Sequence, residues 1–430
     1  MSKNIIKELL LRKLIFQSTN IDKMKNLFFK NNIKLYCGFD PTADSLHIGH
    51  ILPLILLKRF QEYGHTPIIL LGGGTSLIGD PSFKNCEREL YVKKKTFGWI
   101  KKISAQISSI FNSNIFEKKI IILNNYDWLK NLNLLKFLRK IGKFFSINSM
   151  INKESVKKRL LSIGNKGLSF TEFSYSLLQA YDYYFLYKKY NVKLQIGGSD
   201  QWGNITSGIQ LIKKKFHKNV FGLTLPLLVQ KNGKKFGKSE KNTVWLDKKK
   251  TSVYDFYQFW LNIKDEDVYK YLNFFTFLKI YQNFDKNIKS LSFQNIIKLK
   301  KILAKEMTIL IHGKENFNSA KKVSYIFFKK NICSMKIDNF LELIKNNAPH
   351  IILNYKNNSH LSLKNILILT KLSCSKKKSK NMILSNSIMI NKKIQNNVNY
   401  VLKSSDKIFN KYTIISKGKK QYFLICWSKL

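Results

Sequence analysis

The sequence predicts an α/β protein with a doubly wound, mostly parallel sheet domain, followed by a helical domain and a small α+β domain. Over residues 1–250, short apolar runs that end in glycine alternate with helical patterns, as parallel strand–helix–strand crossovers require. Residues 251–347 are helical and aromatic, without strong strand signals. Residues 348–430 mix an apolar run, a basic helix start and a short strand. These three ranges are the expected domains.

The chain is strongly basic. Its 430 residues include 76 Lys and Arg against 26 Asp and Glu, which gives a net charge of +50. This charge favours a polyanionic partner such as nucleic acid. The alternative is that much of the lysine excess is only solvated surface, because lysine, asparagine and isoleucine crowd the least patterned stretches.

The cysteines and the apolar runs bear on location. Five cysteines occur without a paired C-x-x-C spacing, which favours a reducing compartment and argues against a zinc site. No apolar run approaches the length of a membrane span, and Met1–Leu11 mixes lysine and glutamate among its apolar residues. We therefore expect a cytoplasmic protein with no membrane segment and no secretory signal.

The segment Leu35–His50 predicts a strand, a tight turn and a helix start. An apolar strand pattern ends at Gly38, and His47-Ile48-Gly49-His50 opens an apolar helical run. The unpaired N–H groups at a helix start can hold a phosphate, and histidines three apart share a helical face. One ligand could therefore contact both rings, with Gly49 allowing close approach. The alternative is a histidine pair that only packs at a helix cap.

Three more strands are predicted at 67–71, 120–123 and 192–196. The first of these ends in Gly72-Gly73-Gly74-Thr75, and the last ends in Gly197-Gly198-Ser199-Asp200-Gln201. Glycines at these positions leave room for a ligand at the carboxyl ends of the strands, where open α/β sheets bind their ligands.

A stripe of polar side chains is predicted on a later helix. Tyr175, Gln179 and Asp182 are spaced i, i+4 and i+7, so they lie on one face. Taken alone, such a stripe is typical of a half-buried surface face, and a ligand pocket is the alternative.

A lysine-rich turn follows the last predicted strand. Asn232-Gly233 is a tight-turn signal, and Lys235-Phe236-Gly237-Lys238-Ser239 comes directly after it. By itself this segment is typical of a solvated turn in so basic a chain.

Together, these segments resemble class I aminoacyl-tRNA synthetases, in the form found in bacterial-type tyrosyl-tRNA synthetases. The resemblance implies a Rossmann-like catalytic domain at 1–250, a helical anticodon-side domain at 251–347 and an S4-like RNA-binding domain at 348–430. It also implies an inserted helical dimer-interface region at about 125–190, where 129–166 reads as basic helices. The matching segments are His47–His50, Gly79–Ser82, Asn124–Trp128, Phe170–Asp182, Gly197–Asn204 and the signature loop Lys235–Ser239.

The chain departs from the family pattern in two places. Phe83 stands where the family usually has glycine, between Asp80 and Lys84. In the basic helix start Ser373–Lys380, lysines stand where the family has arginines, and lysine lacks the planar fork that contacts phosphate at two points.

The resemblance assigns roles to individual residues. The tyrosine substrate would be gripped at its α-amino group by Tyr175 and Gln179 and at its phenol by Asp182 as acceptor and Tyr36 as donor. Phosphate charge would be stabilised by the catalytic residues His47, His50, Lys235 and Lys238, with Lys84 and Arg88 as weaker candidates. The full tyrosine-binding set is Tyr36, Asp80, Tyr175, Gln179, Asp182 and Gln201. The full ATP-binding set is Gly38, Asp40, Thr42, His47, Gly49, His50, Gly198, Asp200, Lys235, Lys238 and Ser239.

The implied activity is ATP-dependent attachment of L-tyrosine to tRNA(Tyr) by a homodimer, with Mg²⁺ accompanying ATP and no metal held by the protein. Two alternatives remain. One is the tryptophan-specific sister family, which shares the signatures, although Tyr36, Gln179 and Asp182 favour tyrosine. The other is a non-catalytic RNA-binding protein on a synthetase scaffold, for which an eroded site would be expected.

Overall fold

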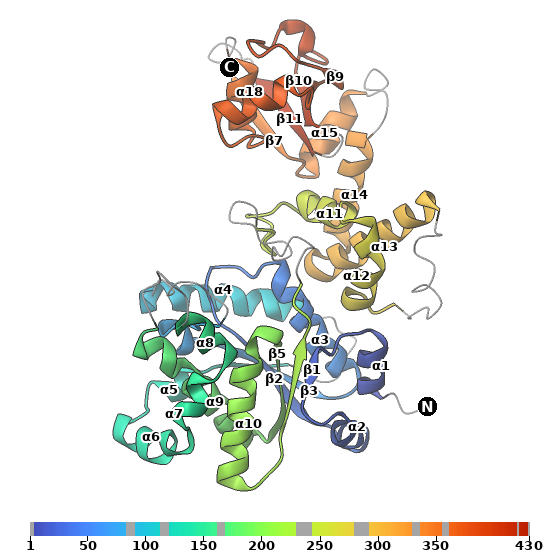
Figure 1. The fold of residues 1–430 in the computed structure, drawn as a ribbon. Helices are drawn as coiled ribbons and strands as arrows, with labels where there is room; N and C mark the ends of the chain where they lie inside the picture. The colour runs from blue at the N-terminus through green and yellow to red at the C-terminus, as the bar shows by residue number, and fades with distance from the viewer. Residues whose placement is uncertain are drawn as a thin grey trace. The chain divides into compact units, whose positions relative to one another are not determined.

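A computed structural model of the chain divides into two compact units (Figure 1). Unit 1 holds Met1–Asp247 with Lys270–Asp285, and unit 2 holds Lys248–Tyr269 with Lys286–Leu430. Each unit contains one sheet. The structure describes residues 4–82, 91–111, 120–160, 168–228, 243–278, 292–328, 336–354, 361–418 and 421–428.

The sheet of unit 1 has six strands in the order β1-β6-β5-β2-β3-β4. All neighbours pair in parallel except β1, which runs antiparallel to β6 at the edge. The mostly parallel sheet is therefore confirmed, and the four predicted strands are β2 to β5. The sequence does not predict β1 or β6. The strands are β1 (Gln17–Ser18), β2 (Lys34–Phe39), β3 (Thr66–Leu71), β4 (Ile121–Asn124), β5 (Val192–Gly198) and β6 (Phe221–Leu225).

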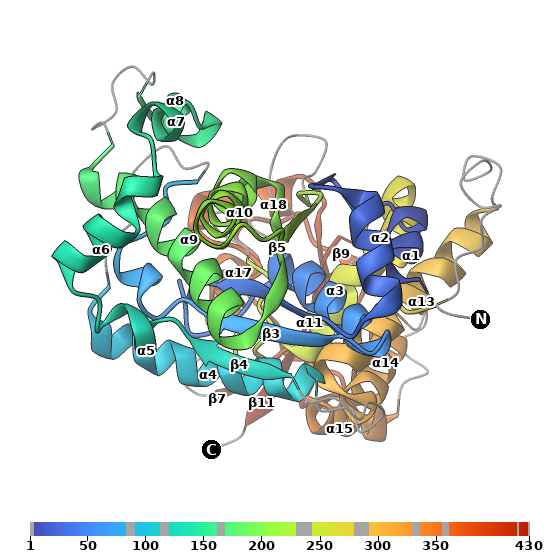
Figure 2. The same ribbon diagram turned by 90° about the horizontal axis from the view of Figure 1, so that it is seen from below.

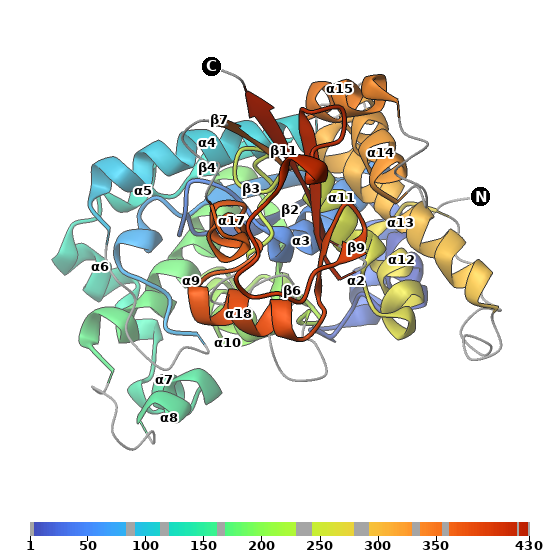
Figure 3. The same ribbon diagram turned by 90° about the horizontal axis from the view of Figure 1, so that it is seen from above.

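Helices cover both faces of this sheet. Figures 2 and 3 show α9 (Phe170–Tyr190) and α10 (Trp202–Phe216) on one side and α4 (Lys93–Phe111) on the other. The inner strand β3 is buried from Pro67 to Leu71, because both of its faces meet helices. This confirms the doubly wound arrangement.

Helix α3 (Ile51–Glu62) is fixed at its C-terminal end by a charge cluster. Arg59 and Arg12 both donate to the carbonyl oxygen of Thr276, just past the end of α12 (Val268–Phe275). These bonds satisfy a carbonyl that the helix end leaves without a partner in the helix. Glu8 accepts from Arg12 at 2.7 Å and from Arg59 at 2.8 Å, and so offsets the two buried cations. The other end of α3 is consequently held in place at the carboxyl edge of the sheet.

The inserted region of unit 1 begins with short helices that precede α9, which confirms the helical prediction over its described part. It exposes large apolar side chains, with Leu134 at 68% and Leu135 at 76% exposure. We call this set the exposed apolar surface; it comprises Leu134, Leu135, Leu138, Ile147, Ile151, Leu160 and Phe170. The helices are α5 (Tyr126–Leu129), α6 (Leu134–Lys140), α7 (Ile147–Ile151) and α8 (Glu154–Leu160).

Unit 2 begins with helices and ends with a mixed sheet. The helices confirm the helical prediction for 251–347 where it is described, and they are α11 (Val253–Leu261), α13 (Phe293–His312), α14 (Lys314–Phe328) and α15 (Ile337–Lys345). The sheet has the order β7-β11-β10-β8-β9. Its strands are β7 (His350–Asn354), β8 (Ile388–Ile390), β9 (Lys393–Ile394), β10 (Tyr412–Lys417) and β11 (Gln421–Ser428). With α17 (Leu363–Leu369) and α18 (Lys376–Leu384) it forms the predicted α+β tail, in which α18 is the basic helix and β8 the short strand.

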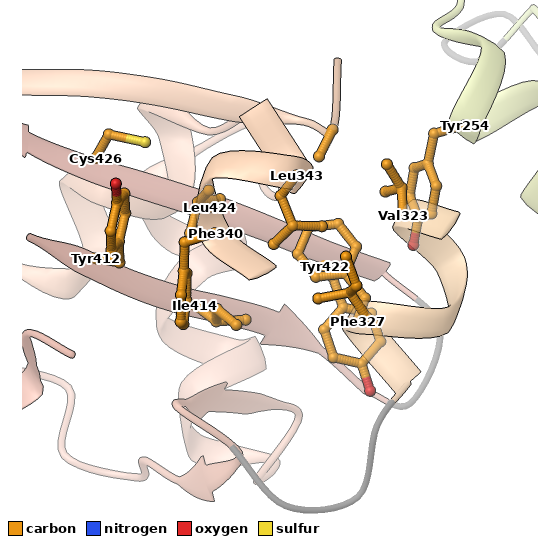
Figure 4. Close-up of a cluster of buried hydrophobic side chains, with 12 residues drawn as sticks. Tyr254, Val323, Phe327, Phe340, Leu343, Tyr412, Ile414, Tyr422, Leu424 and Cys426 are labelled. Atoms are coloured by element: carbon orange, nitrogen blue, oxygen red, sulfur yellow. The ribbon is translucent and has the colours of Figure 1, made fainter. Parts of the chain in front are cut away.

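One apolar cluster joins the helices and the sheet of unit 2 (Figure 4). The ring of Phe340 on α15 stacks on Tyr412 of β10, with centroids 4.8 Å apart. The ring of Phe327 on α14 stacks on Tyr422 of β11 at 5.5 Å. Ala348, between the last helix and the sheet, belongs to the same cluster. The helices and the tail sheet therefore share one core.

Candidate active site

A pocket of about 630 Å³ lies at the carboxyl ends of the parallel strands of unit 1. Its volume suits a small organic ligand or two adjacent ones. Every predicted site residue that the structure describes contributes to its lining. These residues are Tyr36, Gly38, Asp40, Thr42, His47, Gly49, His50, Asp80, Tyr175, Gln179, Asp182, Gly198, Asp200 and Gln201. Lys84, Arg88, Lys235, Lys238 and Ser239 lie outside the described residues.

The two histidines cap the helix start at the pocket wall. The backbone N–H of Gly49 donates to His47 Nδ1 at 3.1 Å, and the backbone N–H of His47 donates to His50 Nδ1 at 3.1 Å. Their rings lie 4.0 Å apart, centroid to centroid. The alternative of a cap and the hypothesis of a shared ligand face are therefore compatible, because the two rings that cap the helix start also line the pocket.

The caps determine the tautomer of each ring. A backbone N–H can only donate, so each Nδ1 must be an unprotonated acceptor, and in the neutral ring the proton is on Nε2. A residue with a Cβ at position 49 would place that atom 2.9 Å from His47 Cε1, so glycine is needed for the ring to fold back onto the helix start. The site thus offers two Nε2–H donors from one helix start.

Asp182 is buried at the other side of the pocket lining, with 1% exposure. Its Oδ2 accepts from Asn125 Nδ2 at 2.9 Å and its Oδ1 accepts from Trp128 Nε1 at 2.8 Å. Burial raises the pKa of the Asp182 carboxyl from 3.8 to about 7, against the effect of these two donors, which lower it. The predicted polar stripe therefore faces a pocket and not solvent.

Three buried oxygen atoms on residues of the same pocket have no hydrogen-bond partner within the described parts of the chain. They are Tyr36 Oη, Gln179 Oε1 and Gln195 Oε1, and their residues all line the pocket. Burial and the Asp182 charge raise the pKa of the Tyr36 phenol, so its hydroxyl stays protonated and can donate. Buried polar atoms in native proteins are almost always paired, so the presence of three such atoms in one pocket lining favours a polar ligand there.

Two further carboxylates stand in the pocket wall. Asp40 accepts from Thr75 Oγ1 and from the Tyr175 hydroxyl, both at 2.8 Å. Asp80 accepts from Gln201 Nε2 at 2.9 Å. These bonds hold the carboxylates in fixed positions, and fixed carboxylates suit a cationic group such as an ammonium.

A hydrogen-bond network that the sequence does not predict connects these groups. Asn125 Nδ2 also donates to Thr75 Oγ1 at 2.9 Å, so Asp40 and Asp182 are linked through Thr75 and Asn125. Asn125 follows directly after β4, and a polar residue at that strand end was the available signal. Trp128 lies three residues further on and gives no signal by its type. Thr75, Asn125 and Trp128 thus position the acidic groups of the pocket.

No group of three or more His, Cys, Asp or Glu side chains is arranged to hold a metal ion among the described residues. Asp40, Asp80 and Asp182 accept hydrogen bonds from side-chain donors.

Comparison with known proteins assigns the chain to a family. The family of class I tRNA synthetases (W and Y) matches residues 30–329. The SYY-like C-terminal domain of tyrosine–tRNA ligases matches residues 341–425. This chain belongs to the class I tRNA synthetases for tryptophan and tyrosine.

The relatives reported next are named for tyrosine alone, whereas the family covers tryptophan and tyrosine. The tyrosine–tRNA ligase of Buchnera aphidicola subsp. Schizaphis graminum (strain Sg) is 51% identical over 430 residues, which cover 99% of this chain and 100% of that protein. The tyrosine–tRNA ligase of Buchnera aphidicola subsp. Baizongia pistaciae (strain Bp) is 47% identical over 433 residues and covers both chains fully. Among solved structures, a C-terminally truncated Aspergillus nidulans mitochondrial tyrosyl-tRNA synthetase matches with a TM-score of 0.65 and 30% identity, over 74% of this chain and 92% of that chain.

Proposed function

We propose that this chain is a tyrosine–tRNA ligase. It activates L-tyrosine with ATP to tyrosyl-adenylate and diphosphate, and then transfers the tyrosyl group to the terminal adenosine of tRNA(Tyr). The observation that carries the choice of amino acid is that one pocket is lined by the buried Asp182 carboxylate and by the Tyr36 hydroxyl, which has no hydrogen-bond partner among the described residues. A phenol can donate to the first and accept from the second.

The rest of the pocket fits the other end of tyrosine. Asp80 and the Gln179 amide supply acceptors for the α-ammonium group, and the hydroxyl of Tyr175 is held toward Asp40. Gln201, held by Asp80 and Asn204, is assigned to the carboxylate that reacts. The substrate would thus be fixed at both ends before chemistry begins, which is the main source of rate in such a reaction.

The histidine pair and the glycine-bounded strand ends fit ATP. In the first step a tyrosine carboxylate oxygen attacks the α-phosphorus in line, a P–O bond forms, and the bond to the leaving diphosphate breaks. No side chain acts as a nucleophile. We assign the Nε2–H groups of His47 and His50 to the phosphate oxygens, where charge grows in the transition state. Gly38, Asp40, Thr42, Gly49, Gly198 and Asp200 are assigned to the remainder of the nucleotide.

The lysines of the signature loop complete the proposed phosphate site. Lys235, Lys238 and Ser239 lie outside the described residues, but Leu228 and Trp245, the pocket-lining residues nearest to them on either side, are described. Mg²⁺ is proposed to arrive with ATP and to be held by its phosphates.

The exposed apolar surface supports a homodimer. Monomeric proteins rarely group leucines as exposed as Leu134 and Leu135. Such a group is typical of a surface that a second protein chain covers. Leu135→Lys should therefore shift the protein toward monomer, because a charge would be buried in the interface. Size-exclusion chromatography with light scattering measures the mass. Leu10→Lys, at an exposed leucine on α1 (Ile5–Leu11), is the matched control and should leave the mass unchanged. A wild-type chain of monomer mass would contradict the dimer.

We also place the protein in the cytoplasm, together with tRNA and ATP. Its three described cysteines, Cys37, Cys374 and Cys426, are free thiols. Within the described ranges, no helix is both long and apolar enough to cross a bilayer.

The proposed function is tested by tyrosine-dependent exchange of pyrophosphate into ATP, run beside tryptophan and phenylalanine. Exchange with tyrosine is expected to exceed exchange with either analogue by orders of magnitude. Preferred exchange with tryptophan would assign the chain to the sister specificity. No exchange with any of the three would favour the non-catalytic RNA-binding alternative.

His47→Asn separates the two roles of the ring. The Asn Oδ1 atom can replace Nδ1 as the acceptor that caps the helix, but nothing replaces the Nε2–H donor. The variant should therefore keep its thermal stability and lose about tenfold or more in kcat for tyrosine activation. His65→Asn, at a buried histidine outside the pocket, is a control that should affect stability more than rate. A rate loss matched by an equal loss of tyrosine binding would contradict the assignment of His47 to phosphate.

The pKa of Asp182 predicts a pH dependence. If the ionised carboxylate is the form that accepts from the phenol, kcat/KM for tyrosine should fall by up to about tenfold for each pH unit below 7. The fall occurs on the acid side because a raised carboxyl pKa means that protons are taken up below that value. Asp182→Asn should remove this limb from the profile. If the limb persists at the same midpoint in Asp182→Asn, another group causes it.

A further inference from the structure

We propose that Trp245 is a positioning residue for His47, and that it fixes the direction in which the His47 Nε2–H group points. The inference rests on the proposed function and adds to it a residue that the sequence signatures leave out. Trp245 lies in the short segment that the structure describes after residue 242, and it lines the same pocket as His47 and His50.

The backbone brings the two side chains together. The N–H of Ile48 donates to the carbonyl of Val244 at 3.0 Å, and the N–H of Leu246 donates to the carbonyl of Leu46 at 2.8 Å. His47 and Trp245 are thus opposite each other in an antiparallel bridge, with hydrogen bonds on both sides but none between them. In such a pair the Cα atoms approach to about 4.5 Å, closer than in any other cross-strand arrangement, and the side chains lie on the same face.

The rings make the contact that this register predicts. The centroids of the His47 imidazole and the Trp245 indole lie 6.2 Å apart, with planes at 68° to each other. This is an edge-to-face geometry within the range that stabilises aromatic pairs. The indole adds to two other contacts of the His47 ring, the Gly49 N–H at Nδ1 and the His50 ring.

These contacts leave little freedom for Nε2. The hydrogen bond at Nδ1 fixes one atom of the imidazole, but small rotations about the Cβ–Cγ bond would still swing Nε2 away from a phosphate oxygen. The His50 and Trp245 rings restrict that rotation, so the donor is aligned before ATP binds. Trp245 is only partly buried, so its replacement removes a ring contact without opening the core.

The experiment is a double-mutant cycle on tyrosine-dependent pyrophosphate exchange by the full-length chain. Trp245→Leu should lower kcat by about tenfold and leave KM for tyrosine and for ATP within about twofold, and Trp245→Phe should recover most of the rate because it restores a ring. In a His47→Asn background, Trp245→Leu should have almost no further effect, since its effect acts through the His47 ring. Thermal unfolding of each variant is measured alongside.

Two results would overturn the inference. Additive losses in the double variant would mean that Trp245 acts independently of His47. A raised KM for ATP with unchanged kcat would mean that the indole binds the nucleotide directly. If Trp245→Leu does not fold, Trp245→Phe and Trp245→Met in the same cycle decide between coupled and additive effects. A wild-type chain with no exchange activity would overturn the proposed function itself, a result distinct from additivity in an active enzyme.

Discussion

Asp182→Ala should lower kcat/KM for tyrosine by at least about 10²-fold, and that for phenylalanine by less than about tenfold. Only tyrosine loses a charge-assisted hydrogen bond, from its phenol to the carboxylate. Phenylalanine makes no such bond. Its kcat/KM should therefore fall only by the factor that the disturbed pocket imposes on both substrates. That shared cost arises because the variant leaves the donors of Asn125 and Trp128 without their acceptor.

Three comparisons make the result specific. Both amino acids are measured by pyrophosphate exchange in each variant. Tyr36→Phe removes a neutral partner and should leave most of the discrimination in place. Asp127→Ala removes an exposed carboxylate on α5, outside the pocket lining, and should leave both substrates unaffected. An equal loss for tyrosine and phenylalanine in Asp182→Ala would mean that Asp182 is structural and that the phenol contacts other residues.

Lys238→Ala should lower kcat for tyrosine activation by about 10²-fold or more and change tyrosine affinity little. The expected reason is that negative charge on the phosphates grows in the transition state, when the diphosphate begins to leave. A lysine that contacts these phosphates stabilises the transition state more than the ground state. In the proposed function, tyrosine binds in the part of the pocket around Asp182, and the residues assigned to it come from outside the Lys235–Ser239 loop. Equilibrium binding of tyrosine, measured beside single-turnover activation, separates the two quantities.

Lys241→Ala is the matched control, because it removes a lysine from the same stretch of chain but outside the Lys235–Ser239 signature. It should keep the wild-type rate. A similar loss in both variants would point to the general positive charge of the segment. Tyrosine affinity reduced as much as the rate in Lys238→Ala would contradict a transition-state role.

The strands that could be predicted are those with a recognisable run of apolar residues in the sequence. β2, β3 and β5 are apolar runs that end at or beside glycine, and near-continuous apolar runs are typical of buried parallel strands. β6 is as fully buried as these, but Gly222 and Thr224 interrupt its apolar run. β1 has two residues and exists only because it pairs with β6. The residues Tyr422 to Trp427 of β11 do carry the aromatic and branched side chains that favour strands, and that signal was available.

The candidate site also has a part that local spacing predicts and a part that only the structure reveals. His47 and His50 could be placed together because four residues of one helix start hold both. Tyr175, Gln179 and Asp182 could be placed on one face because helical spacing determines it. Asn125 and Trp128 reach Asp182 from more than fifty positions earlier in the chain, through the crossing of two elements. No local pattern encodes such a contact, so the network between Asp40 and Asp182 required the structure.

The core that the tail sheet shares with α14 and α15 has a consequence for how the tail can change over generations. Deleting the chain from Ala348 onward would expose Phe327, Phe340 and Leu343, at roughly 2 kcal/mol for each side chain. Selection on folding alone would therefore retain the tail even if its surface no longer touched RNA. Surface arginines could be replaced by lysines at little cost, while Tyr412 and Tyr422 could not be lost as easily. The presence of this segment in related proteins can thus be explained by its role in folding. Its presence is not evidence that it still binds a nucleic acid.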